Sequence, residues 1–269
     1  MRALGREILD RYKTARTLVV GGTSLRGLVL YPVRHRLPNP RHQIDLKTGL
    51  SMVSPLDVPL VRVFEDIWVK RCYTRDDFKV TSGDTVVDIG ASIGVFSIWA
   101  ATRAQGVRVI AVEPSPRIFN FLVQNLSRNR LRQVVPVQAA CGGEGGGAIL
   151  YSRGFEGGNS MYARDNAGRT FRPLAEVLVQ TLDEIFRRHE VAICNLLKLS
   201  CVGAEYEVLF NASEDTLRRI SKISMEYHLG LNDHCLAEMV SFLEQRGFGV
   251  NFTAPYDDEC GYLFARQRI

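Results

Sequence analysis

The chain has 269 residues, of which 46% are hydrophobic and 23% are charged, and its formal net charge is +5. This composition can bury a large core, so it excludes a disordered protein and fits one large α/β domain or one domain with an appendage. No apolar run approaches the roughly 20 residues of a membrane span, and the N-terminus lacks the pattern of a secretory signal, so we expect a cytoplasmic protein.

The cysteine spacing and the absence of recognition motifs argue against a metal centre and against a nucleic-acid partner. The six cysteines are scattered, with no CxxC pair and no zinc-site spacing, so we expect reduced thiols and no metal centre. No motif typical of DNA or RNA recognition is found in the sequence, so we expect no nucleic-acid partner.

The N-terminal part of the chain carries most of the excess positive charge. The first 42 residues hold nine Lys and Arg against two acids. Helical spacing from Leu4 to Tyr12, then a Gly- and Pro-punctuated stretch from Gly21 to Pro59, predicts a basic extension of helix and short strands over 1–60. Such an extension could contact an anionic surface weakly or lie solvated on the main domain, which we place at 61–269.

From about Gly83 onward, apolar runs alternate with amphipathic segments, which predicts a parallel sheet with crossover helices. The runs are rich in β-branched residues and nearly unbroken, as is typical of strands covered on both faces. Strands are expected at Thr85 to Ile89, Val107 to Val112, Val134 to Ala140, Leu196 to Ser200 and Ile220 to Glu226. Helices are expected at about 94–103, 116–129, 182–189, 204–211 and 233–246.

Two segments depart from this alternation. Val250 to Thr253 and Gly261 to Arg266 are separated by a loop too short for a crossover helix, so they should pair as an antiparallel hairpin. The fold class is therefore α/β, with a mostly parallel seven-stranded sheet that ends in this hairpin. Residues 142–173 are so rich in glycine that we expect a loop or lid, with one strand near 149–151.

The stretch TVVDIGASIGVFS contains the clearest binding signal. A strand that ends near Asp88 and turns through Gly90 and Gly94 into a helix leaves bare backbone where a ligand can come close. The next strand ends in Glu113, 25 residues after Asp88, where an acid can accept hydrogen bonds from both ribose hydroxyls of an adenosine. NAD remains an alternative, but its fingerprint is GxGxxG, and here Ser92 stands where the second glycine would admit a pyrophosphate.

The chain resembles the FkbM-type family of S-adenosylmethionine-dependent methyltransferases. The motifs that carry the resemblance span about Phe64 to the C-terminus; they are VVDIGASIGVFS, AVEPSPRIFNFLVQNLSRN, VQAACGGEGG, GGNSMYAR, VQTLDEIF, LLKLSCVGAEYEVL and ISMEYH. The resemblance implies a class I methyltransferase Rossmann-like fold and S-adenosylmethionine as cofactor.

The resemblance also implies roles for individual residues around the cofactor. Asp88, Gly90, Ala91 and Gly94 would form the turn around its methionine part, with Ser92 facing it. Glu113 would bind the ribose, and Ala139 and Ala140 would lie near the adenine. Tyr73 and the neighbours Asn159 and Ser160 would close over the cofactor or the substrate.

One segment departs from the family pattern, which reads close to LLKIDVEGAE. Here the chain reads NLLKLSCVGAE, so Asn195, Ser200 and Val202 stand where the family has acids. Serine cannot take up a proton near neutral pH and valine offers no polar group, so a metal-assisted mechanism at this strand is disfavoured.

Three residues remain as candidates for catalysis. His228, just past the strand SKISMEYH, can act as a base at the carboxyl end of the sheet, or it packs without touching substrate. Glu226 lies two residues earlier on the same face and could orient it. Lys198 could hold a substrate oxygen or pair with a neighbouring acid. Glu205 and Glu207 begin a helix, which favours a structural role.

The sequence therefore favours an O-methyltransferase acting on a hydroxyl of a small molecule, such as a sugar or a polyketide-like natural product. The alternative is a cofactor-binding protein whose catalytic strand is degenerate at Ser200 and Val202, acting as a scaffold or in other chemistry. A nicotinamide-dependent oxidoreductase is a weaker third hypothesis. The acceptor and the oligomeric state have no signal in the sequence.

Overall fold

The computed structural model describes residues 22–23, 41–75, 77–154, 158–255 and 259–268. The predicted N-terminal helix and most of the basic segment lie outside these residues. A separate extension over 1–60 stays a prediction.

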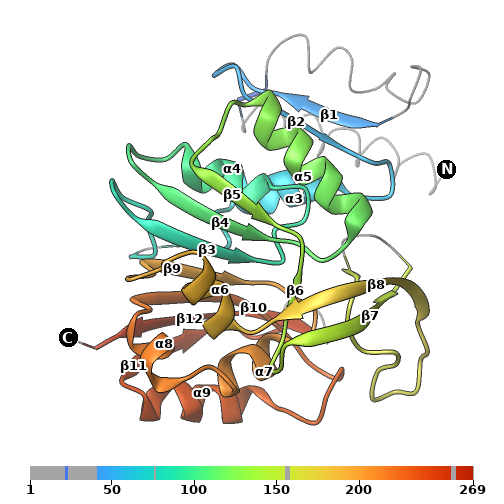
Figure 1. The fold of residues 1–269 in the computed structure, drawn as a ribbon, viewed down its shortest axis with the longest axis vertical. Coiled ribbons are helices and arrows are strands. Elements are labelled where there is room, and N and C mark those ends of the chain that lie inside the picture. Colours follow the sequence, from blue (N-terminus) through green and yellow to red (C-terminus); the bar gives the residue numbers. More distant parts are fainter. Residues whose placement is uncertain (1–21, 24–40, 76, 155–157, 256–258, 269) are drawn as a thin grey trace, which may run out of the picture.

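A seven-stranded sheet runs through the molecule (Figure 1). Its strands are β3 (Thr85–Ile89), β4 (Arg108–Val112), β5 (Val134–Val137), β9 (Leu196–Leu199), β10 (Lys222–His228), β11 (Phe248–Phe252) and β12 (Cys260–Gln267). The order is β11-β12-β10-β9-β3-β4-β5, and β12 alone is antiparallel to its neighbours. The predicted mostly parallel sheet with a C-terminal antiparallel hairpin is confirmed.

Alternate residues of the central strands supply two separate cores. Val86 and Val109 belong to one core, and their neighbours Val87 and Ile110 belong to the other. The first face is covered by α3 (Leu60–Phe64), the π-helix η2 (Glu65–Val69), α4 (Val95–Ala101) and α5 (Pro116–Arg128). The second is covered by α6 (Leu182–Arg188), α7 (Glu205–Phe210), α8 (Glu214–Arg218) and α9 (Leu236–Gln245). The short helix α8 was not predicted.

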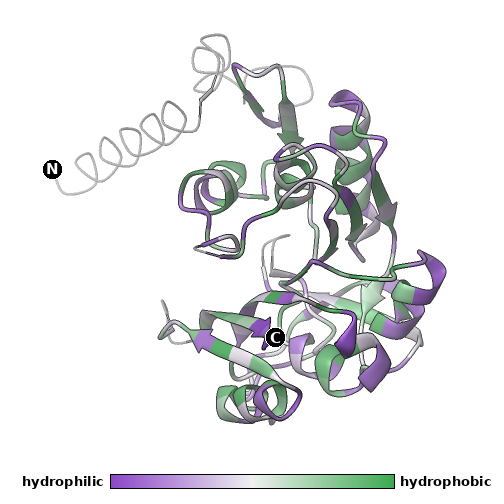
Figure 2. Ribbon diagram, turned by 90° about the vertical axis from the view of Figure 1, so that its left-hand side faces the viewer, coloured by the Kyte–Doolittle hydropathy of each residue, from purple (hydrophilic) through white to green (hydrophobic). Residues whose placement is uncertain are grey.

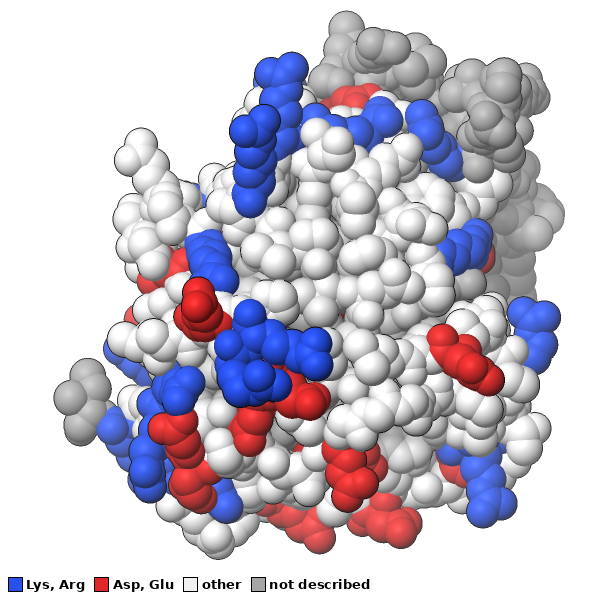
Figure 3. All heavy atoms as spheres, in the orientation of Figure 1, with Lys and Arg blue, Asp and Glu red and all other residues white. Residues whose placement is uncertain are grey.

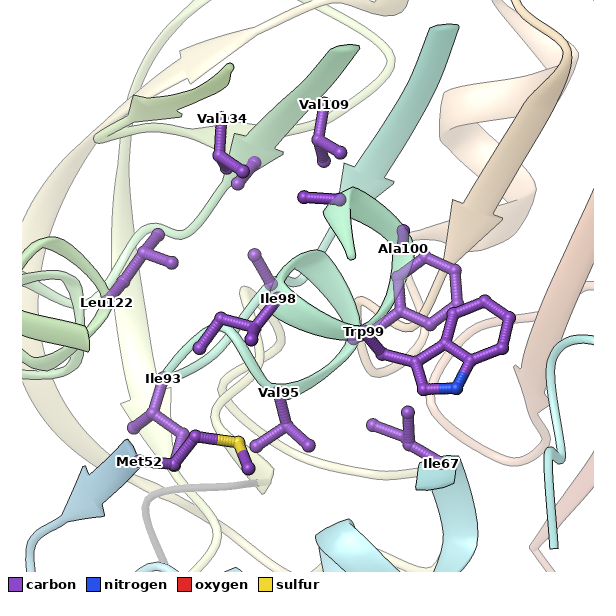
Figure 4. Packing of buried hydrophobic residues seen from close by; sticks show 14 of the residues in the cluster. Met52, Ile67, Ile93, Val95, Ile98, Trp99, Ala100, Val109, Leu122 and Val134 are labelled. Atoms are coloured by element: carbon purple, nitrogen blue, oxygen red, sulfur yellow. The ribbon is translucent and has the colours of Figure 1, made fainter. Parts of the chain in front are cut away.

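Helix α4 lies at the centre of the first core. Figure 4 shows Ile98 of this helix on the side of Leu122 and Val109, and Trp99 on the other side, beside Ile67 of η2. All seven residues of α4 are buried, so this helix has no solvent face. Burial all round fits a helix enclosed between a sheet and other helices, and Figure 2 shows the apolar interior that results.

A two-stranded hairpin, β1 (His42–Asp45) and β2 (Ser51–Ser54), is attached to α5 by buried amides. The Asn125 side chain accepts a hydrogen bond from the Val53 N–H and donates to the Val53 and Ile93 carbonyls, each at 2.8 Å. Asn125 has no exposed surface, so these contacts replace water completely. The hairpin therefore shares a core with α4 and α5.

The glycine-rich segment 142–173 contains the strand that was expected near 149–151. This strand is β7 (Gly146–Ser152), and it is longer than expected. It forms a three-stranded sheet with β6 (Ala140–Cys141), which precedes the segment, and β8 (Arg172–Gln180), which begins at its end and was not predicted. Leu150 packs with Val177 and Val179 in a small cluster of its own.

Figure 3 shows charges of both signs on one face of the molecule: Lys and Arg predominate in its upper part, and Asp and Glu lie among Lys and Arg in its lower part. Among the helices that the structure describes, none combines the length and the apolar character needed to cross a bilayer.

Candidate active site

A cavity of about 830 Å³ opens at the carboxyl ends of β3, β4, β9 and β10. This is the edge of a parallel α/β sheet at which ligands bind. Residues of α3 and η2 form one wall, and the flap, which we define as residues 158–171, forms another. A hydrogen bond from Ser160 Oγ to the Val202 carbonyl (2.7 Å) ties the flap to the turn after β9.

The β3–α4 turn is strained and tightly packed. Gly90, Ser92 and Gly94 have φ values of 75°, 50° and 89°, a region that glycine adopts most easily. A Cβ on Gly90 would lie 1.9 Å from the Ser200 carbonyl oxygen, and one on Gly94 would lie 2.7 Å from Leu122. Both glycines are thus required by neighbouring parts of the protein. Ala91 and Ser92 line the cavity together with Gly90, whereas Gly94 does not.

Asp88 and Lys198 form a buried ion pair beneath this turn. Lys198 Nζ lies 3.0 Å from Asp88 Oδ1 and donates to the Gly90 carbonyl at 2.8 Å. Ser97 Oγ donates to the other Asp88 oxygen at 2.6 Å. Asp88 is fully buried and lies behind the cavity wall, so its carboxylate braces the turn. Of the two roles expected for Lys198, pairing with an acid is the one that the geometry displays.

Glu113 lies at the end of β4 with its carboxylate in the cavity wall. Its oxygens accept hydrogen bonds from the backbone N–H groups of Ser92 and Ser115, each at 2.9 Å. Burial raises the pKa of Glu113 to about 7, against the lowering effect of these two hydrogen bonds. The carboxylate keeps lone pairs for further donors, as a ribose diol requires.

Glu226, Ser200 and Tyr73 form a second polar cluster. Glu226 Oε2 accepts hydrogen bonds from Ser200 Oγ at 2.8 Å and from the Tyr73 hydroxyl at 3.0 Å. Burial, and then the Glu226 charge, raise the pKa of Tyr73 well above its usual value, so Tyr73 stays a donor. The cluster places a carboxylate from β10 beside Ser200, the first residue after β9.

His228 is the last residue of β10, not a residue beyond the strand as the sequence suggested. Its Nδ1 lies 3.0 Å from Glu205 Oε1, and Cys260, its partner across β12, contacts the ring. Burial lowers the pKa of His228, but Glu205, Cys260 and Glu226 outweigh burial and raise it well above the usual value. The prediction that His228 and Glu226 face the same way is confirmed, since both line the cavity.

Glu205 is the functional candidate that sequence reasoning missed. Its position at the start of a helix suggested a structural role, but its carboxylate reaches the imidazole. The signal was available in principle: Glu205 follows β9, His228 ends β10, and the carboxyl ends of adjacent parallel strands meet at one edge.

The remaining predicted residues lie around the same cavity. The residues that line it are Ala139, Ala140, Tyr73, Asn159 and Ser160. An apolar floor beside a buried carboxylate with spare acceptor capacity fits an adenosyl group. Within the described ranges, no group of three His, Cys, Asp or Glu side chains could hold a metal ion.

A family model for the methyltransferase FkbM domain matches residues 88–250. The chain belongs to the FkbM methyltransferase family. The resemblance inferred from its motifs is confirmed, and so is the expected methyltransferase activity. The match begins at Asp88, and it includes Glu113, Glu205 and His228.

Two curated proteins are similar to this chain over more than two thirds of its length. The 31-O-demethyl-FK506 methyltransferase FkbM of Streptomyces tacrolimicus is 29% identical, with 70% of this chain and 81% of the relative aligned. Methyltransferase 1 of Beauveria bassiana is 24% identical, with 78% and 89% aligned. A solved structure, the precorrin-6y C5,15-methyltransferase of Geobacter metallireducens, overlaps with a TM-score of 0.47 at 16% identity, over 84% of this chain and 97% of that one.

Proposed function

We propose that the protein is a metal-independent O-methyltransferase that binds S-adenosylmethionine at the β3–β4 edge and methylates a hydroxyl of a small natural product. The single observation that carries this proposal is that one cavity contains both Glu113 and His228. A carboxylate suited to a ribose and a side chain suited to a hydroxyl proton thus face the same space. The name of the Streptomyces relative, an O-methylating enzyme of a natural product, supports the choice of acceptor.

The cofactor side of the cavity has a distinct task. S-adenosylmethionine supplies an already activated methyl group, so the protein has to align the reactants and exclude water, which can contribute several kcal/mol. Glu113 would accept the ribose hydroxyls, and Gly90, Ala91 and Ser92 would border the methionine part. Asp88, Lys198 and Gly94 would keep this turn in shape from behind, and Ala139 and Ala140 would lie against the adenine.

The acceptor side would handle the proton. With Nδ1 directed to Glu205, Nε2 is the imidazole nitrogen that can take the proton of an acceptor hydroxyl. Because Glu205, Cys260 and Glu226 raise the pKa of His228, the fraction of the imidazole able to act as a base grows as the pH rises. Glu226, with Ser200 and Tyr73 already directed to it, would help to orient the acceptor.

The loss of acids on β9 does not favour the scaffold alternative. Ser200 Oγ donates to Glu226, so the edge retains a carboxylate although the strand itself has none. Val202 has φ 49° and is buried, and its carbonyl anchors the flap through Ser160. A carboxylate from β10 is therefore still available beside Ser200 at this edge.

The test is methyl transfer from labelled S-adenosylmethionine to a panel of hydroxyl-bearing sugars and polyketide-like compounds, with and without a chelator. We expect an O-methylated product in at least one case, at a rate that the chelator leaves unchanged. Tight cofactor binding with no product from any acceptor, extracts of the producing cell included, would establish the scaffold alternative. A rate abolished by the chelator would overturn metal independence.

A further inference from the structure

The imidazole of His228 is held from behind by a carboxylate that has no contact with solvent. Glu205 has no exposed surface, and its Oε1 lies 3.0 Å from His228 Nδ1. The same carboxylate accepts the backbone N–H of Cys201 on Oε1 and that of Gly203 on Oε2, both at 2.8 Å. Three donors from two elements therefore converge on one side chain.

These three contacts fix the orientation of the carboxylate. Cys201 and Gly203 flank Val202 in the turn after β9, where Val202 and Gly203 have φ values of 49° and 99°. A carboxylate held by two backbone donors cannot rotate without leaving buried N–H groups unpaired. The Glu205 oxygen that contacts the imidazole is consequently held as rigidly as the turn after β9.

A fixed acceptor beside Nδ1 of His228 determines which of the two ring nitrogens carries the proton in the neutral imidazole. When one ring nitrogen of a neutral histidine donates, the second becomes the acceptor, and the hydrogen bond also fixes the plane of the ring. We propose that Glu205 is a positioning residue that holds the Nδ1–H of His228 and thereby presents Nε2 to the cavity. The catalytic consequence of this inference rests on the proposed function, whereas the orientation of the His228 ring is independent of it.

The charge of Glu205 also opposes the effect that burial has on the pKa of His228. The titratable groups that influence His228 are Glu205 on α7, Cys260 on β12 and Glu226 on its own strand. Burial on its own lowers the pKa of the ring, and Glu205 makes the largest opposing contribution. Neutralising Glu205 should therefore lower the pKa of His228, because the effect of burial is then less opposed.

The experiment is nitrogen-15 NMR of the full chain labelled at histidine, compared between the wild type, Glu205→Gln and Glu205→Asp. Glu207→Gln is the matched control, because Glu207 lies on the same helix and accepts from Tyr162 at 2.8 Å but does not contact His228. His234, which lies beside Glu238 at 3.3 Å, serves as an internal reference in every spectrum. Circular dichroism and calorimetric binding of S-adenosylhomocysteine verify that each variant is folded.

In the wild type above the titration midpoint, we expect protonated Nδ1 and unprotonated Nε2. In Glu205→Gln the His228 midpoint should fall by about one pH unit or more, whereas Glu207→Gln should leave it unchanged. Glu205→Asp should restore part of the shift, since it keeps the charge. An Nε2-protonated tautomer in the wild type, or an unchanged midpoint in folded Glu205→Gln, would overturn the proposal. If Glu205→Gln does not fold, the wild-type tautomer and Glu205→Asp decide it.

A kinetic measurement separates this inference from the proposed function. With an acceptor in hand, Glu205→Gln should lower kcat about tenfold to a thousandfold, leave the KM for S-adenosylmethionine unchanged, and shift the rising limb of the pH–rate profile to lower pH. An effect on KM alone would contradict a positioning role. If NMR shows the expected tautomer but no acceptor is methylated, the proposed function fails and the orientation of His228 stands.

Discussion

The two edges of the cavity use buried carboxylates in opposite ways. At the β3–β4 edge, Glu113 receives two backbone N–H groups, and burial raises its pKa to about 7. At the β9–β10 edge, Glu205 also receives two backbone N–H groups but has His228 as a third donor. A carboxylate whose remaining acceptor capacity faces a cavity is suited to a ligand, whereas one that already contacts three donors of the protein serves to orient another side chain.

The largest effect is expected when the imidazole of His228 is removed, because this tests the separate roles of the two edges directly. His228→Asn should reduce methyl transfer by about 10²- to 10⁴-fold, because it eliminates the base. The dissociation constant of S-adenosylmethionine, measured by calorimetry, should change less than about threefold, since cofactor binding is assigned to the other edge.

His234→Asn is the matched control, because this exposed histidine pairs with Glu238 away from the cavity. Equal losses in the two variants, or full activity in His228→Asn, would refute the assignment of the base.

A second way to test the comparison is to remove hydrogen bonds that support the β3–α4 turn at the cofactor edge. Asn125→Ala removes three buried hydrogen bonds to Val53 and Ile93, and Ile93 belongs to the β3–α4 turn. We expect the free energy of unfolding to fall by about 2–4 kcal/mol in urea denaturation, since buried backbone groups are left unpaired. Asn120→Ala, on the exposed face of α5, should cost less than about 0.5 kcal/mol. A loss in Asn125→Ala no larger than that in Asn120→Ala would show that the three buried hydrogen bonds of Asn125 add nothing to stability.

A third way is to change the ligand-directed carboxylate. Glu113→Gln should weaken S-adenosylmethionine binding about tenfold to a hundredfold, because hydrogen bonds to charged groups contribute about 1.5–3 kcal/mol. The exposed Glu144→Gln serves as the control in the same calorimetric titration. If Glu113→Gln bound the cofactor as tightly as the wild type, the ribose would have to lie elsewhere.

The smallest effect is that of pH on cofactor affinity. Because the pKa of Glu113 is about 7, its charge is present above that pH and is lost as the pH falls through it. The affinity for S-adenosylmethionine should consequently fall by about fivefold to tenfold between pH 8 and pH 6. Glu113→Gln should show no such dependence. A steep dependence that persists in this variant would assign the titration to another group.

The parallel strands could be predicted because they are short apolar runs, and burial on both faces makes such runs easy to recognise. The i, i+2 alternation also placed His228 and Glu226 on one face. The role of Glu205 could not be recognised from local pattern, because an acid in the first helical turn is favourable without any other task. The strand near 149–151 was recognised from its apolar residues, and it corresponds to β7, whereas its antiparallel partner β8 was not predicted.

The bond from Ser200 to Glu226 has a consequence for how such chains are classified. A comparison limited to the motif on β9 would record a vanished acid and suggest an inactive protein. In three dimensions the Glu226 carboxylate of the neighbouring strand β10 lies 2.8 Å from the Ser200 hydroxyl. The polar groups available to such a chain therefore have to be judged over the whole carboxyl edge of the sheet, because side chains from adjacent strands meet there.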